Sequence, residues 1–182
     1  MTGYRPEFEA ALRMFARISE AMAERGLSRP VLVGGAAAEF YTGSAISTLD
    51  FDLCCIAADA LEDEFIKNGF IRPKSLGHTA LGWVHPDLGL GFEIVADVPM
   101  DGAVRQQRLV RVDNFEPGSA FTIISVEDLI ADRIGQYASG TASDRLGQAR
   151  ELFKLQPYCD LEYLERRIRE ESMGDYGVDI VR

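Results

Sequence analysis

The chain has few cysteines, only three among 182 residues. Cys54 and Cys55 are adjacent, Cys159 stands alone, and no CxxC pair indicates a zinc site or a disulfide framework. No apolar run approaches the length that crosses a bilayer, and no signal-like apolar segment follows Met1. We therefore expect a cytoplasmic protein with reduced thiols and no membrane partner.

Positive charge is also scarce. The chain has 19 Lys and Arg against 29 Asp and Glu, which gives a formal net charge of -10. Proteins that bind long stretches of nucleic acid need a basic surface to displace counterions, and the nearest such patch here is Arg105, Arg108 and Arg111. No extended nucleic-acid partner is therefore expected.

Hydrophobic residues, by contrast, are plentiful enough for a packed core. They make up 47% of the sequence, and its length suits one domain or one domain with a small appended piece. Their spacing predicts helices over 6–25, 36–41, 61–68, 126–137, 144–155 and 161–173, and strands over 30–33, 50–56, 79–84, 91–97 and 108–112. Asp59 is expected to cap the third of these helices from the N-terminus, and Ser125 with Asp128 resembles a capping box. This layout predicts an α+β fold, with an αβ core and N-terminal helix over residues 1–120 and a C-terminal helical segment over 121–182.

The most informative feature is a pair of carboxylates on one predicted strand. Asp50 and Asp52 are two residues apart, so their side chains point to the same face. Phe51, which lies between them, and Leu53, which follows them, are apolar. Two adjacent charges in a buried strand are costly unless a cation or a proton relieves their repulsion. Because Mg²⁺ prefers oxygen ligands and keeps substrate phosphates in its shell, the pair predicts a metal-dependent phosphate site. A solvated edge strand is the alternative.

A glycine pair, Gly34 and Gly35, follows the first predicted strand. Such a pair makes either a tight turn or a place where a phosphate approaches backbone N–H groups at a helix start. Neither GxxxxGK[ST] nor GxGxxG accompanies it, so the P-loop and dinucleotide-binding folds fit poorly. For a third carboxylate that would complete a two-metal site, we prefer Glu93 to Asp97 because the neighbours of Glu93 are more apolar.

Taken in order, these motifs resemble the signature positions of the nucleotidyltransferase superfamily, which shares the DNA polymerase beta-like palm. They are Val33-Gly34-Gly35, Thr48-Leu49-Asp50-Phe51-Asp52-Leu53 and Phe92-Glu93-Ile94. Residues 124–133 and 146–155 look like the helical segment of the branch that includes abortive-infection-type toxins and small uncharacterised nucleotidyltransferases. The chain departs from the family at three positions. Gly35 stands where the family often has serine, and Glu93 where it usually has aspartate. Arg133 stands near a position where the family often has lysine.

The resemblance implies a mixed β-sheet with flanking helices and a nucleotidyltransferase activity. A nucleoside monophosphate would pass from a triphosphate such as ATP to a hydroxyl of a small molecule, a protein or a tRNA end. The implied catalytic residues and ligands of Mg²⁺ or Mn²⁺ are Asp50, Asp52 and Glu93, and the implied nucleotide-binding residues are Gly34, Gly35, Thr48 and Arg133. The alternative is a catalytically inactive binding module of a toxin–antitoxin type system, which Glu93 in place of aspartate keeps open. The sequence names neither the acceptor, nor the preferred base, nor the oligomeric state.

Overall fold

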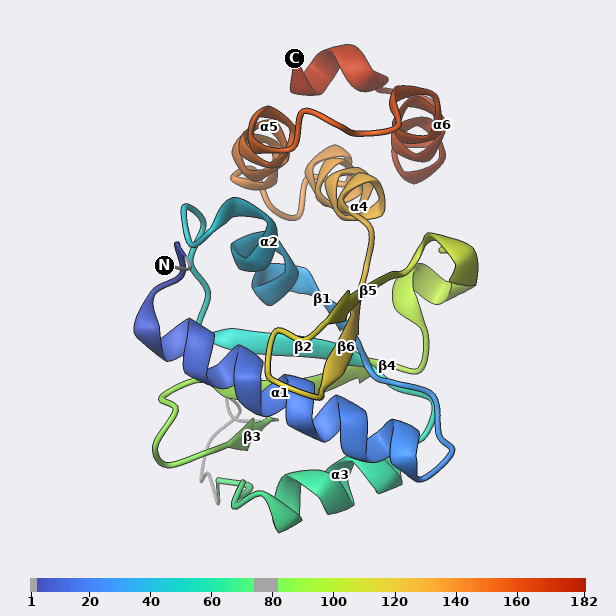
Figure 1. The fold of residues 1–182 in the computed structure, drawn as a ribbon. Helices are drawn as coiled ribbons and strands as arrows, with labels where there is room; N and C mark the ends of the chain where they lie inside the picture. Colours follow the sequence, from blue (N-terminus) through green and yellow to red (C-terminus); the bar gives the residue numbers. More distant parts are fainter. Residues whose placement is uncertain (1–2, 74–81) are drawn as a thin grey trace.

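A six-stranded mixed sheet forms the centre of the protein, seen here in a computed structural model that describes residues 3–73 and 82–182. The strands are β1 (Val31–Val33), β2 (Asp50–Cys54), β3 (Trp83–Val84), β4 (Gly91–Ala96), β5 (Val110–Asp113) and β6 (Ala120–Ile123). The helices are α1 (Pro6–Glu24), α2 (Gly34–Thr42), α3 (Ala58–Lys67), α4 (Val126–Ala138), α5 (Arg145–Leu155) and α6 (Leu161–Glu171), with 3₁₀ turns η1 (Pro99–Gly102), η2 (Gln106–Arg108) and η3 (Val178–Val181). The strand order is β3-β4-β2-β1-β6-β5 (Figure 1), which confirms the predicted α+β class.

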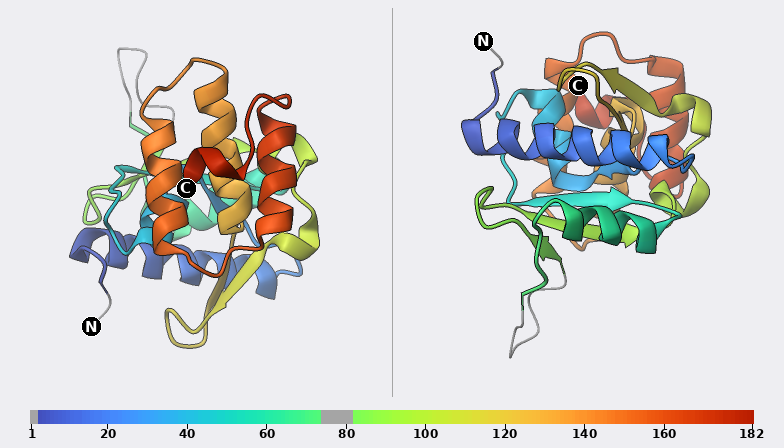
Figure 2. Two further views of the ribbon diagram at one scale, coloured as in Figure 1. Left: turned by 90° about the horizontal axis from the view of Figure 1, so that it is seen from above. Right: turned by 60° about the horizontal axis from the view of Figure 1, so that its bottom comes forward.

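The two faces of the sheet differ in chemistry because side chains alternate along each strand. On one face the ring of Phe51 stacks on Phe92, with centroids 4.6 Å apart, and meets Phe8 of α1 at 5.3 Å. Helices α1 and α3 cover this face, whereas α4, α5 and α6 lie over the other side of the sheet (Figure 2). Asp50 and Asp52 alternate with Phe51, so the carboxylates face the second side.

Strand β6 was not predicted from the sequence. It pairs in parallel with β1 and antiparallel with β5, so it is an interior strand of the sheet. Its short run, Ala120–Ile123, carries no alternation because a central strand is buried on both faces. The boundary expected after residue 120 therefore falls inside β6, and the helical segment begins at Val126. A division into two domains stays a prediction.

The predicted helices are all present, and two of their ends can be checked. Asp59 as the cap of α3 was wrong, because the N-cap is Ala57 and Asp59 lies inside the first turn, where a negative charge favours the helix dipole instead. Ser125 is confirmed as the N-cap of α4, since its Oγ accepts the N–H of Asp128 at 3.1 Å, and the Asp128 carboxylate accepts the Ser125 hydroxyl at 2.7 Å. The predicted strand over 79–84 is seen as β3, and its residues 79–81 lie outside the described residues. None of the described helices combines the length and apolar composition needed to cross a membrane.

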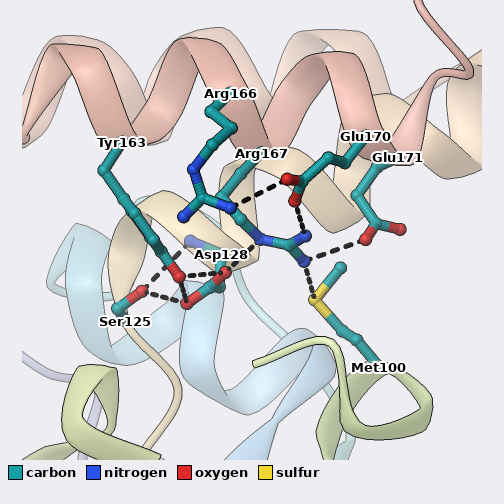
Figure 3. Close-up of polar contacts among 8 residues, drawn as sticks. All are labelled: Met100, Ser125, Asp128, Tyr163, Arg166, Arg167, Glu170 and Glu171. Carbon is teal, nitrogen blue, oxygen red and sulfur yellow. Dashed lines mark hydrogen bonds and ion pairs between the residues drawn. The ribbon is translucent and has the colours of Figure 1, made fainter. Parts of the chain in front are cut away.

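A buried polar cluster fastens α6 to the start of α4 (Figure 3). The fully buried carboxylate of Asp128 accepts hydrogen bonds from Arg167 Nε at 2.7 Å and from the Tyr163 hydroxyl at 3.0 Å. Desolvation and the Asp128 charge raise the pKa of Tyr163 to about 12, so its hydroxyl remains a donor. Because breaking one partner of such a buried pair is strongly destabilising, the cluster fixes how α6 packs on α4.

Candidate functional site

The glycine pair brings α2 and β2 into close contact. Gly34 has φ +61°, and a Cβ there would lie 2.8 Å from Cγ of Asp52 and nearer still to its Oδ2. A Cβ on Gly35 would lie 2.5 Å from Oγ1 of Thr48. The Gly35 N–H also donates a hydrogen bond to the Asp52 carboxylate. The missing side chains therefore first make room for Asp52 and Thr48.

Asp50 and Asp52 line one cavity but differ in environment. Asp50 is exposed, whereas Asp52 is partly buried against the glycine turn. Burial raises the pKa of Asp52, the negative charges of Asp50 and Glu93 raise it further, and the Gly35 N–H and the more distant Arg133 charge act in the opposite direction. The Asp52 carboxylate thus carries a negative charge that its described surroundings compensate incompletely.

Thr48 is held in place by a buried acid that sequence analysis missed. Glu39 of α2 is fully buried and accepts the Thr48 N–H at 2.7 Å, the Ser44 hydroxyl at 2.8 Å and Arg5 Nε at 2.6 Å. Thr48 Oγ1 in turn lies 3.3 Å from the Asp50 N–H. Glu39 therefore positions the loop that leads into β2. The available signal was a lone acid in the otherwise apolar start of α2, Gly34-Gly35-Ala36-Ala37-Ala38-Glu39-Phe40.

Arg133 of α4 reaches the same cavity from the helical side. Its side chain is almost fully buried, and its Nη1 lies 3.0 Å from Oδ2 of Asp132. Its Nε is buried and has no hydrogen-bond partner among the described residues. Desolvation lowers the pKa of Arg133, although the charges of Asp132 and Asp52 oppose that shift. A buried guanidinium with an unused donor is typical of a group that meets an anionic ligand.

The cavity itself has a volume of about 500 Å³, within the range of small-molecule sites. Of the predicted site residues, the structure brings six to its walls: Gly34, Gly35, Thr48, Asp50, Asp52 and Arg133. Five polar side chains that sequence analysis did not single out line it as well: Ser47, Asp132, Gln136, Arg145 and Gln148. Ser47 precedes Thr48, whereas the other four lie on α4 and α5, far along the chain from β2, so no local pattern linked them to the carboxylates.

Glu93 is placed differently from the other predicted site residues. It is the register partner of Asp52 on β4, and its charge raises the Asp52 pKa, but it does not line the cavity. In the described part of the chain, no group of three or more His, Cys, Asp or Glu side chains is placed to hold a metal ion. Two carboxylates do suit Mg²⁺, which commonly takes one or two of them together with substrate phosphates and water. Glu93 as a third ligand stays a prediction.

Comparison with solved structures gives a similar fold. The crystal structure of an antigenic nucleotidyltransferase-like protein from Paracoccidioides brasiliensis matches with a TM-score of 0.62 and 17% sequence identity, over 94% of this chain and 90% of that chain. No protein-family model matches the chain, and no curated protein matches its sequence. At this identity the likeness concerns architecture, so it says nothing of substrate or metal. The chain has a nucleotidyltransferase-like α+β fold.

Proposed function

We propose that the protein transfers a nucleotidyl group from a nucleoside triphosphate to an acceptor hydroxyl, with Mg²⁺ or Mn²⁺ as cofactor. One observation carries the proposal: Asp50 and Asp52 share a cavity with a buried Arg133 whose Nε is unpartnered among the described residues. Carboxylates for a cation and a guanidinium for phosphate are the two kinds of group that a metal–triphosphate complex requires. The nucleotidyltransferase-like fold supports the same interpretation.

Each residue then has a distinct role. Asp50 and Asp52 would hold the ion, which when bound would neutralise charge on the phosphates. Arg133 would donate hydrogen bonds to a phosphate oxygen, and its burial would strengthen them because the local dielectric is low. Thr48 would keep the backbone of Asp50 in position, and Gly34 would keep Asp52 against the turn. Positioning and charge neutralisation would supply most of the rate acceleration.

The first test is nucleotide binding. A ligand that binds only the folded protein raises its melting temperature, so ATP should stabilise the wild type with Mg²⁺ and not with EDTA. Arg133→Met should weaken that binding by roughly 10- to 150-fold, since a hydrogen bond to a charged group is worth about 1.5–3 kcal/mol. The control is Arg150→Met, because Arg150 is an exposed arginine of α5 whose Nε bonds the Ile180 carbonyl. Absence of stabilisation by any triphosphate would instead favour a non-catalytic binding module.

The second test is transfer itself. We expect the wild type with α-labelled ATP and Mg²⁺ or Mn²⁺ to move label onto a component of a cell extract. Asp50→Asn and Asp52→Asn should abolish the transfer, because an amide cannot hold the cation as a carboxylate does. Asp59→Asn makes the same chemical change on the exposed surface of α3 and should leave the transfer intact. Undiminished transfer by Asp52→Asn would contradict the proposed function.

A further inference from the structure

A second cavity, of about 580 Å³, continues the first along the same face of the sheet. Cys54 and Pro99 line both cavities and so form the partition between them. Cys54 is two residues beyond Asp52 on β2, so its side chain points to the same face as the carboxylates. The second cavity therefore begins two residues along β2 from Asp52.

The walls of the second cavity combine aliphatic and polar side chains. The aliphatic residues are Val31, Ile56, Val98, Val104 and Leu109, and the uncharged polar residues are Ser28, Gln106 and Thr122. Three charged residues also line it: Arg29, Asp97 and Arg111.

Both arginines already have a carboxylate partner. Arg29 is paired with Glu20 at 2.8 Å, and the exposed Arg111 is paired with the exposed Asp113 at 2.7 Å. Asp97 makes no ion pair with any described residue. Asp97 is thus the one lining charge without an ion-pair partner among the described residues, and its negative charge disfavours a phosphate-bearing ligand.

The segment beside the partition contacts α6. Next to Pro99, Met100 and Asp101 have φ of 49° and 52°, left-handed conformations that non-glycine residues rarely adopt. Such strain persists only where the surrounding structure enforces it. Here Met100 lines the first cavity, and its sulfur lies 3.6 Å from Nη2 of Arg167 in the buried cluster on α6 (Figure 3). The two cavities are thus kept separate but adjacent.

We propose that the second cavity binds the acceptor, a small molecule that carries a hydroxyl on an apolar body and no anionic group. This rests on the proposed nucleotidyl transfer in the first cavity. The acceptor oxygen would attack the α-phosphorus, an O–P bond would form, and the bond from that phosphorus to pyrophosphate would break. The hydroxyl proton would leave to a carboxylate of the first cavity and then to solvent. A nucleic-acid acceptor would instead require several free cations, whereas the two arginines described in this cavity each have a carboxylate partner.

The test fills the second cavity and follows the label. The probe is α-labelled ATP with Mg²⁺, incubated with the dialysable, RNA and protein fractions of a cell extract. Wild type should label only the dialysable fraction. Val104→Trp should reduce that labelling at least tenfold while Mg²⁺-dependent stabilisation by ATP stays unchanged, because the bulky ring fills the acceptor space alone. Val110→Trp places the same ring on exposed β5, outside both cavities, and should label as wild type does.

The outcomes separate the two proposals. Stabilisation by ATP also shows that Val104→Trp is folded. Leu109→Trp is a second variant whose tryptophan ring would fill the second cavity. Label on RNA or protein, or undiminished labelling by both filled variants, would overturn the acceptor assignment and leave nucleotidyl transfer standing. If wild type does not bind ATP in the presence of Mg²⁺, both the acceptor assignment and the proposed nucleotidyl transfer are overturned.

Discussion

A methyl group at Gly34 should damage the site by moving Asp52. Gly34→Ala introduces a Cβ that would lie 2.8 Å from Cγ and 2.9 Å from Cβ of Asp52. Real Cβ atoms do not approach so closely, so either β2 or the turn must shift. Gly34 also has φ +61°, a left-handed conformation that an L-residue adopts only at a cost. The substitution therefore combines backbone strain with crowding of the carboxylate.

Two other glycines separate these contributions. Gly43 has φ +57° and nothing within 4 Å of its would-be Cβ, so Gly43→Ala measures strain alone. That strain is about 1–2 kcal/mol, or roughly 2–8 °C in melting temperature for a chain of this size. Gly35→Ala adds crowding against Thr48, at 2.5 Å from its Oγ1, where overpacking costs about 1–3 kcal/mol. Gly34→Ala should therefore lower the free energy of unfolding by about 2–5 kcal/mol, which is more than Gly43→Ala or Gly35→Ala should.

The assay combines urea unfolding with Mg²⁺-dependent ATP binding. Gly43→Ala should lower stability and leave binding unchanged, because Gly43 lies at the far end of α2 from the cavity. Gly34→Ala should lower both. Asp52→Ala should change the free energy of unfolding more favourably in the Gly34→Ala background than in wild type, because it removes the crowded carboxylate. The reasoning is refuted if Gly34→Ala unfolds at the same urea concentration as Gly43→Ala and binds ATP as wild type does.

Three further predictions concern individual carboxylates. Burial raises the folded-state pKa of Asp52, so its ionised form opposes folding. The metal-free Asp52→Asn variant should therefore have a higher melting temperature than wild type at neutral pH, and this difference should disappear as the pH falls through the raised pKa toward about 4. Equal melting temperatures at all pH values would disprove this. Glu39→Gln should cost about 1.5–3 kcal/mol in urea unfolding, since Glu39 accepts hydrogen bonds from Arg5 and Thr48, and an unchanged midpoint would count against its positioning role. If Glu93 is a third ligand, Glu93→Gln should abolish label transfer while Glu93→Asp retains it; equal transfer by both variants would remove Glu93 from the site.

Short-range patterns were enough for most of the elements. The helical spacing of apolar residues predicted α1, and the alternation of acids and apolar residues predicted β2 with both carboxylates on one face. These features were predictable because the direction of the side chains in a helix or strand repeats every few residues, whatever surrounds that element. β6 was missed because a central strand buried on both faces has no such alternation.

Sequence patterns were enough to predict that Asp50 and Asp52 lie on one face of a strand and that a glycine turn precedes them. What surrounds the two carboxylates becomes apparent only in the folded protein. Gly34 makes room for Asp52, and Arg133, about eighty residues further on, enters the same cavity with an unused donor. Cys54 and Pro99 then separate that cavity from a second one. These residues share no local periodicity. They are brought together by the register of β1, β2 and β4 and by the packing of α4 on α6.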